Sequence, residues 1–196
     1  MGLRAGDLRV GADYEGARLE RRAVAIELRR RRRVGLGDLL SVVFENEETL
    51  RAAAEEALRA ERVEDPESVA AEVARWQPLL PAAGELVATL YLEVAEAAKL
   101  GELAGDLAGI AECVYLEVDA RRSPGTVATP DDAAAASAAA PAAYLRFALS
   151  DSQREAWREG ARVVLGVAHP RCSATTELSD EQRATVAQDL DLREEV

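Results

Sequence analysis

The chain has 196 residues and carries 36 acidic against 24 basic side chains, so its formal net charge is −12. This length suits one domain with a full hydrophobic core, whereas the acidic excess repels a phosphate backbone and counts against nucleic-acid binding as the main role. Two cysteines, Cys113 and Cys172, provide neither a disulfide framework nor a zinc quartet, which favours a reducing compartment.

The N-terminus and the apolar runs both argue against export or membrane insertion. The first seven residues lack the apolar stretch of a signal peptide, and no apolar run reaches the roughly 18 residues that a spanning helix needs. We therefore expect a cytoplasmic protein with no membrane insertion.

Residues 15–33 predict an amphipathic helix, because no glycine or proline follows Gly16 and four apolar side chains stand among charged neighbours: Leu19, Val24, Ile26 and Leu28. Gly35 and Gly37 then turn the chain. We do not interpret this pair as a phosphate-binding loop. It lacks the third glycine of a dinucleotide-binding loop, and it precedes a strand, whereas such a loop follows one. That strand is the short, β-branched piece over residues 39–44.

Two more helices and a strand follow. Asn46 can cap a helix that continues until Asp65 and Pro66 interrupt the pattern. Pro66, in the tolerated first turn, can open the next helix, which carries Trp76 near its end. Strict alternation of side chains then predicts a strand over residues 85–94.

The second half alternates between strand and helix patterns. Strands are predicted over residues 113–118, 143–149 and 162–167, and helices over residues 95–107, 151–157 and 179–192. Ser123, Pro124 and Gly125 predict a hairpin turn, and residues 130–141 form an alanine-rich connector or loose helix. Together these elements predict a single α+β domain over residues 1–196, with a mostly antiparallel sheet of about five strands flanked by helices.

The most unusual local feature is a run of five arginines at the end of the first helix: Arg29, Arg30, Arg31, Arg32 and Arg33. The helix dipole favours positive charge at a C-terminus, but five adjacent guanidinium groups repel one another and cannot all be buried. Most of them should meet solvent or an acidic partner. A genomic preference for arginine is an equally good explanation of the run, because Lys99 is the only lysine.

Reactive side chains are too sparse to define a catalytic or metal site. His169 is the only histidine, and Cys172 nearby has no third group to complete a catalytic set. We therefore expect no catalytic residues, metal or cofactor. Arg146 is the better candidate for a ligand contact, because a guanidinium on a covered sheet face needs a carboxylate or a bound anion, although an open sheet face would leave it in solvent.

Several segments carry a family pattern when they are read in order. They are residues 31–37 (RRRVGLG), 43–46 (VFEN), 56–63 (EALRAERV), 78–81 (PLLP), 144–149 (YLRFAL) and 166–170 (GVAHP). This series, from about residue 5 to residue 190, resembles a bacterial family catalogued as domain of unknown function 3501. The chain departs from the family pattern at Ala168, where members tend to carry an acidic residue, and it is plainer in the alanine-rich stretch.

The resemblance implies a compact α+β domain, and it also implies a genomic neighbourhood of iron-sulfur or flavin-linked oxidoreductases and rubrerythrin-like proteins. We therefore expect a non-catalytic accessory or protein-interaction subunit that docks such a redox protein through Arg29–Arg33. The alternative is an enzyme or small-molecule binder in which Tyr144, Arg146 and His169 converge on an anion. The sequence also leaves a homodimer open.

Overall fold

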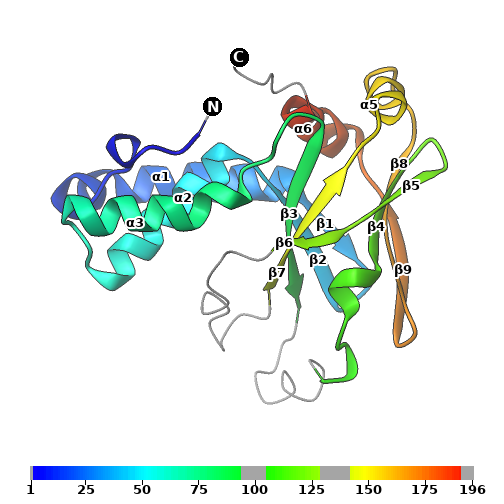
Figure 1. Ribbon diagram of the computed structural model, residues 1–196, viewed down its shortest axis with the longest axis horizontal. Coiled ribbons are helices and arrows are strands. Elements are labelled where there is room, and N and C mark those ends of the chain that lie inside the picture. Colours follow the sequence, from blue (N-terminus) through cyan, green and yellow to red (C-terminus); the bar gives the residue numbers. More distant parts are fainter. Residues whose placement is uncertain (1, 94–104, 129–141, 191–196) are drawn as a thin grey trace.

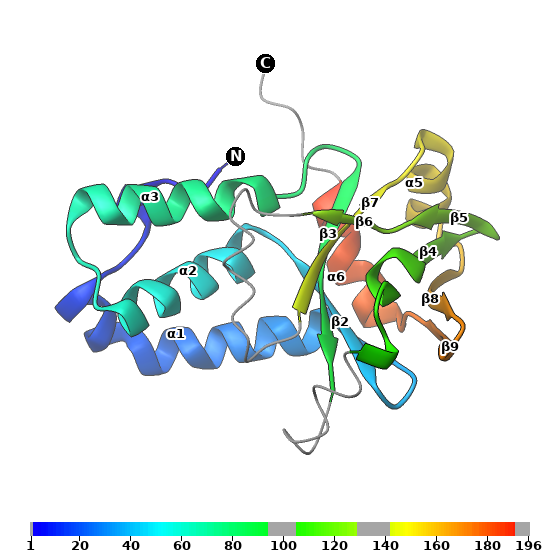
Figure 2. The ribbon, with the colours of Figure 1, turned by 60° about the horizontal axis from the view of Figure 1, so that its bottom comes forward.

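The computed structural model describes residues 2–93, 105–128 and 142–190. Helices α1 (Gly11–Arg32), α2 (Glu47–Glu61) and α3 (Pro66–Trp76) gather on one side of the molecule, and the strands lie on the other (Figure 1). The three helices lie side by side in Figure 2. Short 3₁₀ turns cover Ala5–Asp7, Gln77–Leu79 and Ile110–Cys113.

Local sequence signals set the ends of α2 and α3. Asn46 accepts a hydrogen bond from the backbone of Thr49, whose hydroxyl accepts one from the Asn46 backbone in return, a reciprocal arrangement that satisfies the free N–H groups of a helix start. Asp65 caps α3 through the Ser68 backbone, with Pro66 as the first helical residue. Both predicted helices are confirmed, although α2 already ends at Glu61.

The strands form two antiparallel sheets. The first has five strands in the order β1 (Arg33–Leu36), β2 (Leu40–Glu45), β3 (Glu85–Leu92), β7 (Ala142–Ala148) and β6 (Thr126–Ala128). The second has four, in the order β5 (Arg121–Pro124), β4 (Val114–Val118), β8 (Val163–His169) and β9 (Cys172–Glu177). The predicted α+β class with antiparallel pairing is confirmed, and the strands divide between two sheets.

The main hydrophobic core lies between these sheets. Each sheet contributes alternate residues, and those that are almost fully buried include Phe44, Leu86, Phe147, Leu116 and Leu165. The remaining helices, α5 (Asp151–Arg158) and α6 (Asp180–Leu190), add Trp157, Val186 and Leu190 to the same core. A smaller core joins the N-terminal segment, α2 and α3 through Leu3, Leu58 and Val69.

Two expectations from the sequence need correction. Residues 33–36 form strand β1 rather than a turn, and the turn itself comes at Gly37, whose φ of 66° suits glycine. Residues 123–125 do not form a hairpin, because β5 pairs with β4 and β6 pairs with β7 in the other sheet. The tight hairpin lies at Asp119 and Ala120, which both have positive φ angles, as a two-residue turn requires.

The first helix also differs from its predicted amphipathic form. Its packed face carries Tyr14 and Arg32, whereas Leu19, Val24 and Ile26 are exposed. Strand β9 was not predicted, because its alternation of small and polar residues resembles a loop. Most of the predicted helix over residues 95–107 and the whole connector over residues 130–141 lie outside the described residues.

Candidate functional site

The five arginines at the end of α1 have different environments, and Arg32 is buried. Its exposed fraction is 1%, its Nε donates to the carbonyl of Phe44 at 2.7 Å, and its Nη2 donates to the carboxylate of Asp189. Longer contacts of 3.4 Å reach the carbonyls of Glu45 and Thr185. Arg32 therefore fastens α1 to β2 and α6, and it is not available to a partner.

Asp189 on α6 is the acidic partner of this buried guanidinium. Burial raises the pKa of Asp189 to about 6, and the attraction of Arg32 opposes that rise only in part. Because this pKa is raised in the folded state, the stability of the fold depends on pH and falls as Asp189 ionises.

Arg29 and Arg33 lie over the face of the first sheet that points away from the main core. Arg29 Nη1 lies 3.4 Å from the Tyr91 hydroxyl, and its Nη2 lies 3.9 Å from Glu45. Arg33 stacks over the Tyr91 ring at 5.3 Å, donates to Ser41 at 3.0 Å and pairs with Glu93. These arginines thus cover a polar layer on the outer face of the sheet.

Glu45 is the buried centre of this polar layer. One carboxylate oxygen accepts a hydrogen bond from Thr89 at 2.6 Å, whereas the other has no hydrogen-bond partner among the described residues. Burial raises the pKa of Tyr144 to about 12, and the nearby negative charge of Glu45 is the next largest cause of this rise. Tyr144 therefore stays neutral across the physiological range, and Arg29 is the cation paired with the Glu45 carboxylate.

Three arginines remain exposed and form what we name the basic edge: Arg30, Arg31 and Arg33. Their side chains are 59%, 50% and 45% exposed. Arg30 and Arg31 both donate to Glu27 at 2.9 Å, and these hydrogen bonds lower the pKa of Glu27 to about 2. The prediction that most of the run meets solvent or acidic groups agrees with these placements.

A cavity of about 280 Å³ opens between α1 and α2. Its floor holds the buried carboxylate of Glu55, which accepts two hydrogen bonds from Arg21, at 2.7 and 2.8 Å, and one from the Arg9 backbone. Beside it the Tyr14 hydroxyl donates to Glu56 at 2.7 Å, and burial raises the pKa of Tyr14 to about 12. These contacts give both carboxylates hydrogen-bond partners and hold α1 against α2.

The alternative ligand site is only partly assembled. Tyr144 and Arg146 share the outer face of β7, where Arg146 pairs with Glu85 and donates to the Pro78 carbonyl at 2.7 Å. His169 belongs to the second sheet, and its Nε2 lies 3.2 Å from the Ala108 carbonyl. Since the main core separates the two sheets, the structure does not bring His169 to the other two residues.

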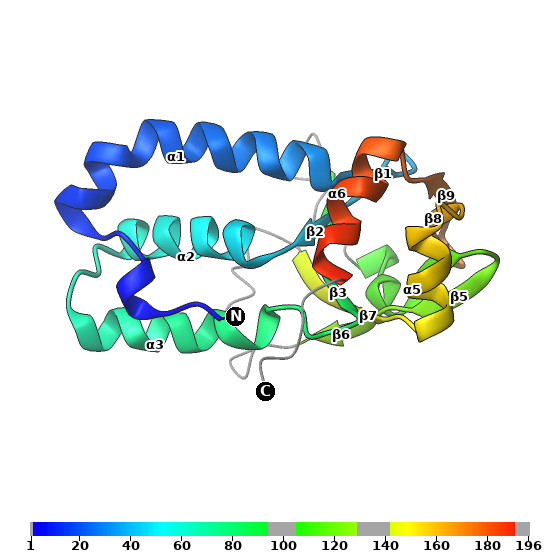
Figure 3. The same cartoon turned by 90° about the horizontal axis from the view of Figure 1, so that it is seen from above.

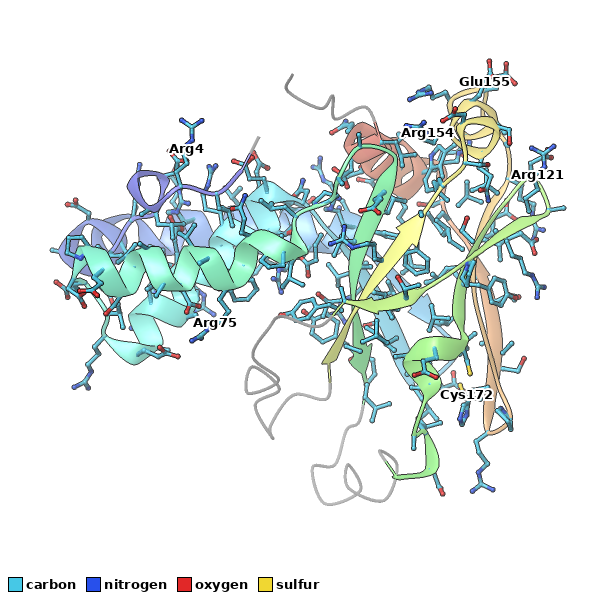
Figure 4. The ribbon with its side chains drawn as sticks, viewed as in Figure 1. Arg4, Arg75, Arg121, Arg154, Glu155 and Cys172 are labelled. Carbon is cyan, nitrogen blue, oxygen red and sulfur yellow. The ribbon has the colours of Figure 1, made fainter. Side chains whose placement is uncertain are left out.

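The cysteines and acidic groups do not form a metal centre in the described part of the chain. Cys113 and Cys172 are both free and half-buried. Cys172 lies by the second sheet, well away from Arg4 and Arg75 in the helical layer (Figure 4). Among the described helices, none has the length and apolar character needed to cross a bilayer.

Reasoning from the sequence missed Glu45, Asp189 and the exposed apolar face of α1. Glu45 follows a run of buried apolar residues, so a carboxylate there is a weak signal of a buried polar contact. Asp189 gave no signal, because its pairing with Arg32 joins residues 157 positions apart.

Comparison with known proteins shows similarity to a protein family and to a solved structure. The family described as "Protein of unknown function (DUF3501)" matches residues 3–190. A crystal structure described as a novel protein of unknown function from Burkholderia pseudomallei K96243 is 28% identical, with a TM-score of 0.89, and the alignment covers 97% of this chain and 100% of that one. No curated protein matches. Because the family match spans nearly the whole chain, the protein belongs to the DUF3501 family.

Proposed function

We propose that this protein is a non-catalytic accessory subunit of the cytoplasm that docks a redox protein through the basic edge. The observation that carries the proposal is the exposure of Arg30, Arg31 and Arg33 at one end of α1, in a chain with a net charge of −12. Arginine makes paired hydrogen bonds to carboxylates and is enriched in protein interfaces.

The acidic neighbours of the basic edge do not block such docking. Glu27, Glu93 and Glu181 are themselves 46%, 45% and 57% exposed. Exposed ion pairs contribute only about 0–1 kcal/mol, so carboxylates of a partner can replace them at little cost. The partner class, an iron-sulfur, flavin-linked or rubrerythrin-like protein, rests on the genomic neighbourhood that the family resemblance implies.

A tagged bait in the native host tests this proposal. The variant R30Q/R31Q/R33Q removes the basic edge and keeps Arg32, which the fold requires. A matched control, R59Q/R162Q/R171Q, removes three partly or mostly exposed arginines that pair with Glu15, Glu177 and Asp106 elsewhere on the surface. We expect the redox partner to co-purify with the wild type and the control and to be lost with the first variant.

Salt supplies a second check on the same bait. Docking through exposed charges weakens steeply as ionic strength rises, because the Debye length falls to about 8 Å at 0.15 M. Equal recovery of the partner with all three baits at physiological salt would contradict the role of the basic edge.

The second proposal is binding of a small anion at Tyr144 and Arg146. It is favoured by their shared sheet face, but it requires the ligand to displace Glu85 from Arg146. Thermal-shift screening with organic acids and phosphorylated metabolites tests it, since a specific ligand raises the unfolding temperature by mass action. A shift lost in R146Q would favour this proposal over docking.

A further inference from the structure

The solvent-facing side of α1 carries an apolar stripe. Its members are all exposed and recur at helical spacing: Ala12, Gly16, Leu19, Ala23 and Ile26. Leu19 and Ile26 are 85% and 63% exposed, and across the described residues the other large exposed apolar side chains are only Val24 and Val127. Such a concentration on one helix indicates a contact surface rather than scattered surface residues.

This stripe is not an unfilled part of the protein's own core. The opposite side of α1 already packs, through Tyr14, Arg21 and Arg32, against α2, β2 and α6. Figure 3 shows α1 along one long edge of the molecule, with α2 on its inner side. The outer face of a 22-residue helix is therefore free to meet another molecule.

The charges along α1 indicate what that molecule is. Its first half carries Asp13, Glu15 and Glu20 together with Arg18 and Arg21, but those two arginines pair with Glu56 and Glu55 of α2, so the exposed charges of this half are acidic. In the second half Arg29 and Arg32 contact the protein's own sheet and α6, and the exposed charges are mainly Arg22, Arg30 and Arg31. A second α1 packed antiparallel places the acidic half of each helix beside the basic half of the other. The two helix dipoles then point in opposite directions, and this arrangement is also favourable.

The sizes of the stripe residues fit the same arrangement. A two-fold axis level with residue 21 places Leu19 opposite Ala23 of the second copy and Ile26 opposite Gly16 of the second copy. Each large side chain then meets a small one, as close helix packing requires. An isologous contact of this kind closes on itself and gives a dimer.

We propose that the protein forms a homodimer through antiparallel packing of its α1 helices along the stripe of Ala12, Gly16, Leu19, Ala23 and Ile26. The contact meets the basic edge only at Arg30, which follows Ile26 by four residues and lies opposite Ala12 of the second copy. The variants still separate the two proposals, because L19E/I26E keeps every arginine of the basic edge and R30Q/R31Q/R33Q keeps every residue of the stripe. Failure of one proposal therefore leaves the other standing.

Sedimentation equilibrium of the full chain, over a concentration series up to about 100 µM, tests the dimer. We expect a dimer for the wild type and a monomer for L19E/I26E. The control V127E places a glutamate on an exposed apolar side chain away from α1, in β6, and should remain dimeric.

A second variant separates loss of the dimer from loss of folding. A Cβ at Gly16 meets no atom within 4 Å in the monomer, and replacing a helix-interior glycine favours the helix. G16E should therefore raise the unfolding temperature of the monomer while it weakens the dimer at least tenfold, because it fills the space opposite Ile26.

Cross-linking checks the direction of packing. In a C113S/C172S background, the 1.5 Å rise per residue places two copies of residue 23 about 6 Å apart along the axis and two copies of residue 12 about 27 Å apart. A23C should cross-link with a short bifunctional reagent, and A12C should not. A wild type that stays monomeric at every concentration, or a dimer unaffected by L19E/I26E, would overturn the proposal, as would capture of a different protein by a monomer through Leu19 and Ile26.

Discussion

Replacement of Arg32 by methionine should remove a large part of the stability of the fold. The change keeps an apolar stem but deletes the guanidinium, which contacts three backbone carbonyls and the carboxylate of Asp189. Asp189 is then left buried without its counter-charge, a change that typically costs about 3–5 kcal/mol. A domain of this kind has a total unfolding free energy of roughly 5–15 kcal/mol, so R32M should come close to unfolding a marginal protein.

Urea unfolding at pH 7, followed by circular dichroism, measures this loss. The matched control is R30M, which removes a neighbouring arginine that is 59% exposed and should change stability by less than about 0.5 kcal/mol. The double variant R32M/D189L should recover part of the loss, because it removes the unpaired carboxylate as well. A loss below about 1 kcal/mol for R32M, or equal losses for R32M and R30M, would refute the structural role of Arg32.

Three further predictions concern stability. Because the pKa of Asp189 in the folded state is raised to about 6, above its ordinary value of 3.8, its protonation stabilises the fold below about pH 4 and this contribution disappears as pH rises through 6. D189N should therefore flatten the fall in unfolding free energy between pH 4 and 6, and an unchanged slope would contradict this assignment. G166A should cost about 1–3 kcal/mol, because the added Cβ would lie 2.2 Å from the Tyr115 ring, whereas a loss within error would mean that the ring moves freely. N46A removes the side chain that caps α2 through the Thr49 backbone and should lower the unfolding free energy by about 1 kcal/mol in the same urea assay. An unchanged unfolding free energy would mean that water replaces the cap fully.

Much of the fold could be predicted from local patterns. Strands with strict alternation, such as Glu85–Leu92, and helices with clear caps, such as α2 and α3, follow from interactions between residues close in sequence. The two sheets could not be separated in this way, because strand pairing depends on contacts between distant residues. Strand β9 carries small polar residues on an edge, so its pairing with β8 has little local signal.

The candidate site was predictable in one part only. The arginine run identified the end of α1 as important, but sequence gave no means to distinguish the buried Arg32 from the exposed Arg31 beside it. The difference arises because successive side chains on a helix point about 100° apart, so one faces α6 and the other faces solvent. The same geometry leaves Leu19 and Ile26 exposed, and apolar spacing alone did not show which side of α1 is packed.

The passage of the chain from β5 to β6 has a consequence for how the protein unfolds. Gly125 crosses from one sheet to the other with its N–H bonded to the Val114 carbonyl at 2.8 Å, and an added Cβ there would lie 3.1 Å from the Phe147 ring. Because the chain at Gly125 is in contact with both sheets, neither sheet can separate from the other until this connection is released. Amide protons in β4 and β7 should therefore exchange with deuterium through one common opening, and the strand-bearing half of the molecule should melt as a single cooperative unit.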